Sequence, residues 1–201
     1  MKRIISCALL LFFILPKTNA QQAMEKGQSS VNLYYGLNVL TAYYKGLADA
    51  ANVTGEVEIK GVGPVGIVYE YMVAEKIGLG GEFGYALTSV KYRGNEDPGS
   101  AMIYDYKASV TTMRAQLRMN LHFAKSEKFD GYVLFNGGYR NYNVVWESND
   151  PFFDNVNQSS FVPIGVKVGL GLRYFFVPNF GLHAEIALGS PLMCAGLSFK
   201  F

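Results

Sequence analysis

The fold of this chain is decided by one stretch, Ile164-Gly-Val-Lys-Val-Gly-Leu-Gly-Leu-Arg-Tyr-Phe175. Apolar residues and Tyr174 occupy every even position, whereas the odd positions hold Gly, Lys and Arg before the final Phe175. Successive side chains of a strand point to opposite faces, so a strand separates these two sets, whereas a helix would mix them. The stretch therefore predicts a strand with one apolar and one polar face.

The same period of two recurs along the chain, for example in 113–123 and 180–188. It predicts eight strands, near 31–41, 61–74, 77–93, 104–124, 129–146, 161–176, 180–188 and 192–201. Short turns at 75–76, 125–128 and 178–179 alternate with longer links at 42–60, 94–103 and 147–160, although the last link, 189–191, is short. Short turns on one side and longer loops on the other are typical of an outer-membrane β-barrel.

The alternative is a water-soluble barrel or sandwich, whose apolar strand faces would fill a core. Here the polar face carries long charged side chains among many glycines, an arrangement that suits the narrow lumen of an eight-stranded barrel. The charged residues on this face are Glu70, Glu82, Arg114, Arg118, Arg140, Lys167, Arg173 and Glu185.

Aromatic residues also gather at the predicted strand ends, as two girdles at the membrane interfaces would. Beside the short turns they are Tyr71, Phe123, Tyr132, Tyr174 and Phe180, and beside the longer links Tyr92, Tyr104, Tyr106, Tyr142, Trp146 and Phe161. The sequence thus predicts an all-β fold, an eight-stranded antiparallel up-and-down transmembrane β-barrel.

Residues 1–20 have the layout of a secretory signal peptide: Lys2 and Arg3, an apolar run that ends at Leu15, then small or polar residues. The twelve residues of that run are too few for a transmembrane helix, which needs about 20. We expect cleavage between Ala20 and Gln21, a short periplasmic leader over 21–29, and the barrel domain over 30–201.

Composition and charge argue against several other classes of protein. Only 17% of the 201 residues are charged, which argues against disorder and against an ordinary soluble surface. Removing the three basic residues of 1–20 changes the balance from 18 basic and 16 acidic residues to 15 and 16. A net charge of −1 predicts no nucleic-acid partner. Cleavage would leave Cys194 as a single cysteine, which excludes an intramolecular disulfide.

The strand pattern, the segment 169–175 before a Pro-Asn turn and the ending Gly196-Leu-Ser-Phe-Lys-Phe201 resemble the small eight-stranded outer-membrane barrels of Gram-negative bacteria, OmpX-like and OmpA-barrel-like. The resemblance implies an outer-membrane location, with both termini periplasmic. It also implies outer-membrane lipid and the barrel-assembly machinery as partners. In that family a terminal aromatic preceded by alternating apolar residues is the assembly signal, and here Leu197, Phe199 and Phe201 match it.

Two motifs suggest other chemistry. The segment 61–66 fits G-x-G-x-x-G, but Pro64 and the alternating run after it predict a strand rather than the helix of a nucleotide site. His183 and Glu185 share one strand face, and we interpret them as a buried, hydrogen-bonded lumen pair, because two histidines are too few for a metal site. The sequence predicts no enzyme, no cofactor and no metal.

The inward charges allow two hypotheses. They could form an anion-selective pore, or a network of paired charges that plugs the lumen, and we favour the plug because unpaired charges in a confined space are costly. The predicted function is a structural or surface-interaction role, with links 42–60 and 147–160 as candidate contacts for a surface partner. The alternatives are a small porin-like channel or hydrophobic-solute transporter, and a barrel-embedded enzyme such as an acyltransferase or protease.

Overall fold

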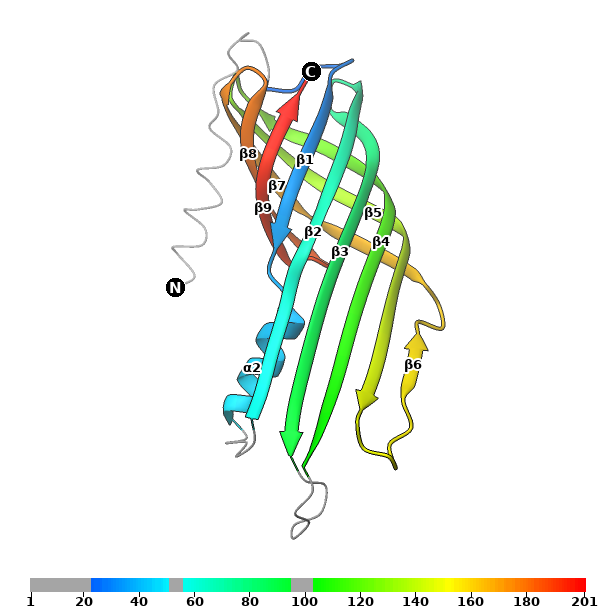
Figure 1. Ribbon diagram of the computed structural model, residues 1–201. Helices are drawn as coiled ribbons and strands as arrows, with labels where there is room; N and C mark the ends of the chain where they lie inside the picture. Colours follow the sequence, from blue (N-terminus) through cyan, green and yellow to red (C-terminus); the bar gives the residue numbers. More distant parts are fainter. Residues whose placement is uncertain (1–22, 51–55, 95–102) are drawn as a thin grey trace, which may run out of the picture.

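The computed structural model describes residues 23–50, 56–94 and 103–201. Within these residues the chain forms nine strands and one helix (Figure 1). The elements are β1 (Ser29–Gly36), α2 (Val39–Ala50), β2 (Glu56–Ala74), β3 (Ile77–Gly94), β4 (Tyr104–Lys125), β5 (Phe129–Ser148), β6 (Val156–Ser159), β7 (Ile164–Val177), β8 (Phe180–Leu188) and β9 (Met193–Lys200).

Eight of these strands close into a barrel. Their order is β4-β3-β2-β1-β9-β8-β7-β5, and the additional pairing of β4 with β5 closes the ring. All of these pairings are antiparallel. Each barrel strand pairs with the barrel strands that precede and follow it in the chain, and the first strand, β1, pairs with the last, β9. This confirms the predicted up-and-down barrel. In the described part of the chain, no helix is long and apolar enough to cross a membrane.

The two faces of the strands point as the alternation predicts. In β7, Lys167 and Arg173 are each 1% exposed, whereas Leu170 is 51% exposed. The outer surface of the barrel is therefore apolar and the interior is polar. A β-barrel of this kind satisfies its backbone hydrogen bonds within the sheet while offering lipid an apolar surface.

The predicted boundaries were wrong around the longer links. The first strand ends at Gly36 rather than 41, and α2 fills much of the link that we expected at 42–60. Asn38 caps this helix, since its Oδ1 accepts a hydrogen bond from the backbone N–H of Thr41 at 3.1 Å. The second strand begins at Glu56 and therefore contains the glycine motif of 61–66.

The sixth predicted strand also begins later than expected, at Ile164 rather than 161. The link 147–160 is not a simple loop, because β6 lies within it and pairs with residues 143–146 of β5. These four residues extend the edge of the sheet where β7 no longer accompanies β5.

Strands β2–β5 continue well beyond the closed barrel (Figure 1). The last pair of β1 with β2 is Tyr35 and Val65, and β7 leaves β5 at Ile164 and Tyr139. We call the projecting part the sheet extension: residues 56–62 of β2, 87–94 of β3, 104–111 of β4 and 143–148 of β5.

The polarity of the two faces inverts in the sheet extension. Its outer face carries a row of charged residues joined in register, Glu58, Lys91, Lys107 and Glu147. Hydrogen bonding to Lys60 lowers the pKa of Glu58. The face that continues the lumen carries apolar rows instead, for example Ile59, Val90, Ala108 and Trp146. A surface with charges outside and apolar residues inside is typical of a structure surrounded by water rather than by lipid.

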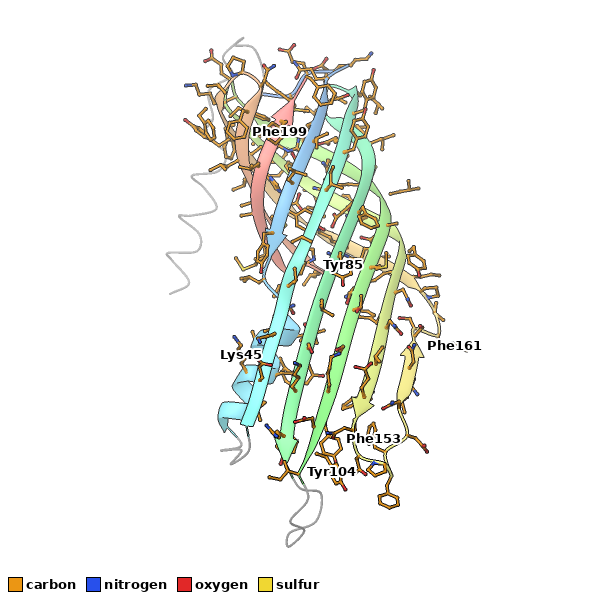
Figure 2. All side chains as sticks on the ribbon, viewed as in Figure 1. Lys45, Tyr85, Tyr104, Phe153, Phe161 and Phe199 are labelled. Atoms are coloured by element: carbon orange, nitrogen blue, oxygen red, sulfur yellow. The ribbon has the colours of Figure 1, made fainter. Side chains whose placement is uncertain are left out.

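Five of the six aromatic residues of one predicted girdle are therefore wrongly assigned. Tyr92, Tyr106 and Trp146 lie on the sheet extension and follow the lumen-facing alternation, so they do not face lipid. Tyr104 and Tyr142 follow the same lumen-facing alternation, Tyr104 on the sheet extension and Tyr142 directly before its β5 part. Figure 2 shows Phe199 near the opposite end of the molecule, where the turns are short. At that end Tyr71, Phe123 and Tyr174 are exposed, as a girdle requires.

Candidate functional site: the lumen charge network

Six of the eight predicted lumen charges meet inside the barrel. Each of them takes part in at least one ion pair with another of the six, and their side chains are 0–1% exposed. The six are Glu70 on β2, Glu82 on β3, Arg118 on β4, Lys167 and Arg173 on β7, and Glu185 on β8. Residues that are far apart in the sequence thus share one interior because the barrel closes.

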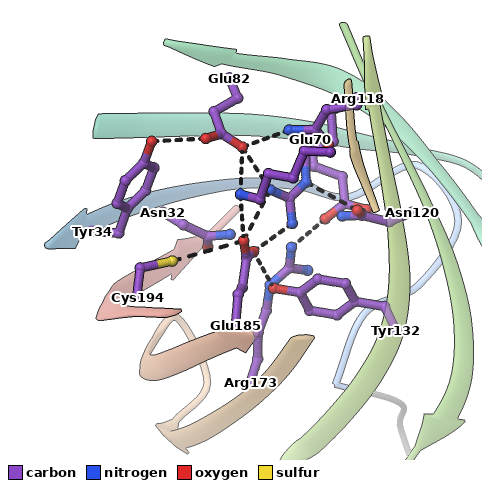
Figure 3. Close-up of polar contacts among 12 residues, drawn as sticks. Asn32, Tyr34, Glu70, Glu82, Arg118, Asn120, Tyr132, Arg173, Glu185 and Cys194 are labelled. Carbon is purple, nitrogen blue, oxygen red and sulfur yellow. Dashed lines mark hydrogen bonds and ion pairs between the residues drawn. The ribbon is translucent and has the colours of Figure 1, made fainter. Parts of the chain in front are cut away.

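The centre of the network holds two carboxylates and two cations in a ring (Figure 3). Arg118 donates Nη1 to Glu82 Oε2 at 3.2 Å and Nη2 to Glu185 Oε1 at 2.5 Å. Lys167 Nζ donates to Glu82 Oε2 at 3.0 Å and to Glu185 Oε2 at 3.1 Å. Each carboxylate therefore contacts both cations, and each cation contacts both carboxylates.

A second cluster lies beside the first, toward the short turns, and contains two residues that we did not predict. Arg173 pairs with Glu70 and, through Nη1, with Asp130 Oδ2 at 3.3 Å. His122 lies between the same two acids, with Nδ1 2.7 Å from Asp130 Oδ1 and Nε2 2.9 Å from Glu70 Oε1. A neutral imidazole has a single N–H, so ionised carboxylates on both nitrogens require the imidazolium form.

Uncharged side chains complete the hydrogen bonding of the acids. Glu82 accepts from the Tyr34 hydroxyl at 2.7 Å and from Asn136 Nδ2 at 2.6 Å. Glu70 accepts from Asn120 Nδ2 at 2.7 Å. Asn120 also accepts from Arg118 Nε at 3.0 Å and so joins the two clusters.

Tyr132 is the clearest error among the predicted girdle residues. It is fully buried, and its hydroxyl donates to Glu185 Oε1 at 2.8 Å. Its ring lies between two guanidinium groups, with the centroid 5.6 Å from Arg118 Cζ and 4.5 Å from Arg173 Cζ. Its even number, shared with Leu134 and Asn136 on the same strand, places it on the lumen side. The alternation therefore indicated a lumen position for Tyr132, but we assigned it to the girdle because it lies close to a turn.

The glycines of the polar face make room for these long side chains. A Cβ at Gly78 would collide with the Glu70 carboxylate, and one at Gly171 would collide with the Tyr132 ring. This agrees with the expectation that glycines line the crowded lumen.

Arg114 reaches the network through a hydrogen bond to Tyr34, whereas Arg140 lies outside it. Arg114 is buried and donates to Ser190 Oγ at 2.5 Å and to the Tyr34 hydroxyl at 3.2 Å. Arg140 is half-buried and lies over the Tyr142 ring, with Cζ 4.6 Å from the centroid. Among the residues that the structure describes, neither arginine forms an ion pair.

The predicted hydrogen bond between His183 and Glu185 is absent. Both side chains are buried, but neither ring nitrogen of His183 has a hydrogen-bond partner among the described residues. The reason is competition, because Arg118, Lys167 and Tyr132 already saturate Glu185. The described part of the chain also contains no cluster of three or more His, Cys, Asp or Glu residues able to hold a metal ion.

The other predicted sites lie at the two ends of the chain. Leu197, Phe199 and Phe201 are all exposed, and the first two sit on the outer face of β9. Cys194, on the same strand, is a buried free thiol. Ala20 and Gln21 lie outside the described residues.

A closed antiparallel barrel with an apolar outer face and a charged interior defines the class of transmembrane β-barrels. The family profile of the outer membrane protein beta-barrel domain matches residues 5–191, and the chain belongs to this family. It is therefore an outer-membrane protein, as the resemblance implied.

The solved structures that this chain is similar to include two from bacteria. The N-terminal β-barrel domain of OprF from Pseudomonas aeruginosa is 15% identical, with coverage of 90% of this chain and 100% of that chain and a TM-score of 0.45. The attachment invasion locus protein Ail of Yersinia pestis is 16% identical, with coverage of 88% and 99% and a TM-score of 0.41. The comparison with curated proteins gave no match.

Proposed function

We propose that this protein is a non-enzymatic outer-membrane barrel with a structural or surface-interaction role, whose lumen is plugged by paired charges. The observation that carries the proposal is the continuous network inside the barrel. It draws side chains from β1, β2, β3, β4, β5, β7 and β8, and the Cys194 thiol of β9 lies 3.9 Å from Glu185. All eight barrel strands therefore contribute to one cluster.

The charges of this network balance. Four carboxylates, those of Glu70, Glu82, Asp130 and Glu185, face three permanent cations and the His122 imidazolium. In an environment of low dielectric constant, paired charges attract strongly and an unpaired charge is costly. Opening a path through the centre would break several of these pairs at once, which supports a closed lumen.

The two ends of the barrel differ in a way that supports a surface role. The short turns and the described ends of the chain lie together, and the sheet extension, α2 and β6 lie at the opposite end (Figure 1). We place the short turns and both termini in the periplasm and the sheet extension outside the cell. Phe152 and Phe161, 93% and 101% exposed, then present aromatic rings to a surface partner. Outer-membrane lipid and the barrel-assembly machinery complete the partners that we propose.

Planar-bilayer recording of the purified full chain tests the plug. We expect no stable open channel at neutral pH. A double variant, Arg118→Ala with Glu185→Ala, removes one cation and one anion and should produce measurable conductance. The matched control, Lys107→Ala with Glu147→Ala, removes an ion pair of the sheet extension and should leave the barrel closed. Steady, size-selective conductance of the unchanged protein would favour the channel over the plug.

A further inference from the structure

The outer mouth of the barrel encloses a cavity that the charge network does not use. Its volume is about 590 Å³, within the usual range of small-molecule sites. Its walls come from the lumen-facing side of the sheet extension, from α2 and from the β8–β9 turn. Residues that represent these walls are Leu40, Tyr44, Val110, Tyr142, Val144 and Leu192.

The lining is mainly apolar and contains one charged residue, Arg140, and no acid. Asn38 and two threonines supply further polar groups, but Arg140 is the cation that reaches the cavity from β5. Its Nε is buried and lacks a hydrogen-bond partner among the residues described. An apolar wall with one unpaired cation fits a ligand that is apolar with one anionic group.

A second, independent observation concerns Arg114, which lies directly opposite Arg140 on the β4–β5 ladder. Like charges in this position normally destabilise a sheet. Arg114 is 1% exposed, its Nε has no partner, and its Nη1 donates to Ser190, which lines the floor of the cavity. Two guanidinium groups without a carboxylate thus lie opposite each other, Arg140 in the cavity wall and Arg114 buried beside it.

An anion bound to Arg140 would offset the positive charge of these two guanidinium groups. The buried ring of Glu82, Arg118, Lys167 and Glu185 lies in the lumen beyond the cavity, and on the proposed plug it closes the way through the barrel. We propose that the mouth cavity binds a free single-chain amphiphile that enters from outside the cell. Its anionic head, such as a carboxylate, lies against Arg140, whose positive charge the buried Arg114 reinforces, and its alkyl chain lies along the apolar wall. This site goes beyond the proposed function.

Trp146 provides a reporter for this site. It is the single tryptophan of the chain and lies on the same face of β5 as Val144, two residues from the cavity wall. The full chain is placed in nanodiscs of phosphatidylcholine and titrated with 10-bromodecanoate, whose bromine quenches nearby tryptophan. We expect saturable quenching. The uncharged 10-bromodecanol should quench more weakly, and acetate or sulfate alone should not compete at equal concentration.

Variants test whether Arg140 binds the anionic head group of the ligand. Arg140→Gln should weaken 10-bromodecanoate binding about tenfold or more, because it removes a charge-assisted hydrogen bond. It breaks no ion pair, so the barrel should still form, and heat-modifiable migration in electrophoresis verifies this. Arg140→Lys keeps the charge and should retain part of the affinity. The matched control is Arg93→Gln, which removes an arginine from the outer face of the sheet extension and should change nothing.

Four results would overturn the proposal. Three of them are quenching that does not saturate, equal binding of the acid and the alcohol, and unchanged affinity in Arg140→Gln. Effective competition by acetate or sulfate alone would replace the amphiphile with a simple anion and would also refute it. This assay does not measure conductance. A negative quenching result would therefore refute the ligand site without refuting the plug, and an open channel would refute the plug without refuting the ligand site.

Discussion

Replacement of Glu185 by Gln should destabilise the barrel strongly, because this carboxylate is shared by Arg118, Lys167 and Tyr132. The amide keeps the shape but removes the charge, so the ion-paired network, whose charges balance, gains one uncompensated positive charge. Removing one partner of a buried ion pair costs about 3–5 kcal/mol. We expect a loss of that size in the free energy of unfolding.

The matched control is an ion pair with similar geometry in a different environment. Lys107 Nζ lies 2.8 Å from Glu147 Oε2, but these side chains are 43% and 51% exposed. An exposed pair contributes about 0–1 kcal/mol, so Glu147→Gln should hardly change stability. Urea titration of both variants in lipid vesicles, followed by electrophoretic mobility, compares the two losses directly.

A double variant separates loss of charge balance from loss of shape. Adding Lys167→Met to Glu185→Gln restores neutrality, so the double loss should be smaller than the sum of the two single losses. A cost below about 1 kcal/mol for Glu185→Gln, or strictly additive losses, would refute the view that the interior depends on balanced charge.

Three further predictions test the lipid-facing side of β7, the C-terminal assembly signal and the cleavage of the signal peptide. Leu170→Arg places a charge on the lipid face and should cost about 2–4 kcal/mol in the same urea titration, the penalty for a charge at the middle of the membrane. Deletion of Phe201 should reduce the folded, heat-modifiable fraction in cells without blocking export, and unchanged assembly would remove its role as a signal. N-terminal sequencing of protein from the outer-membrane fraction should start at Gln21, whereas an intact N-terminus would exclude cleavage.

The alternation of side chains was enough to predict the barrel and most of its lumen, because a strand has only two faces and each residue number assigns one of them. It placed Arg118 and Lys167 inside, and the structure buries both. It did not predict which charges pair, since pairing across the lumen depends on strand stagger and rotamers. Asp130 and His122 also have the even numbers of the lumen face, but they were missed as partners because His122 counts as neutral in the sequence and Asp130 lies beside a turn.

The helix was missed for a different reason. The segment that follows Gly36 contains apolar and aromatic residues that fit either period, and the decisive signal is a single capping residue, Asn38. A cap is a local hydrogen bond rather than a repeating pattern, so a search for periodicity does not detect it. The helix in turn supplies part of the mouth cavity, which is why the sequence alone did not indicate that site.

The inversion of polarity along β3 and β4 marks where the barrel leaves the membrane, and the sequence contains it. Lumen-facing positions change from Glu82 to Val90, and outward positions change from Phe83 to Lys91, without any register shift between β3 and β4. A strand that keeps its alternation but exchanges its two faces has moved from lipid into water. The exchange falls near Leu87, where the shorter strands also stop. Sequence polarity and strand length therefore locate the same boundary independently, and the mouth cavity lies across it, with Val110 on the side of the sheet extension and Arg140 on the side of the barrel.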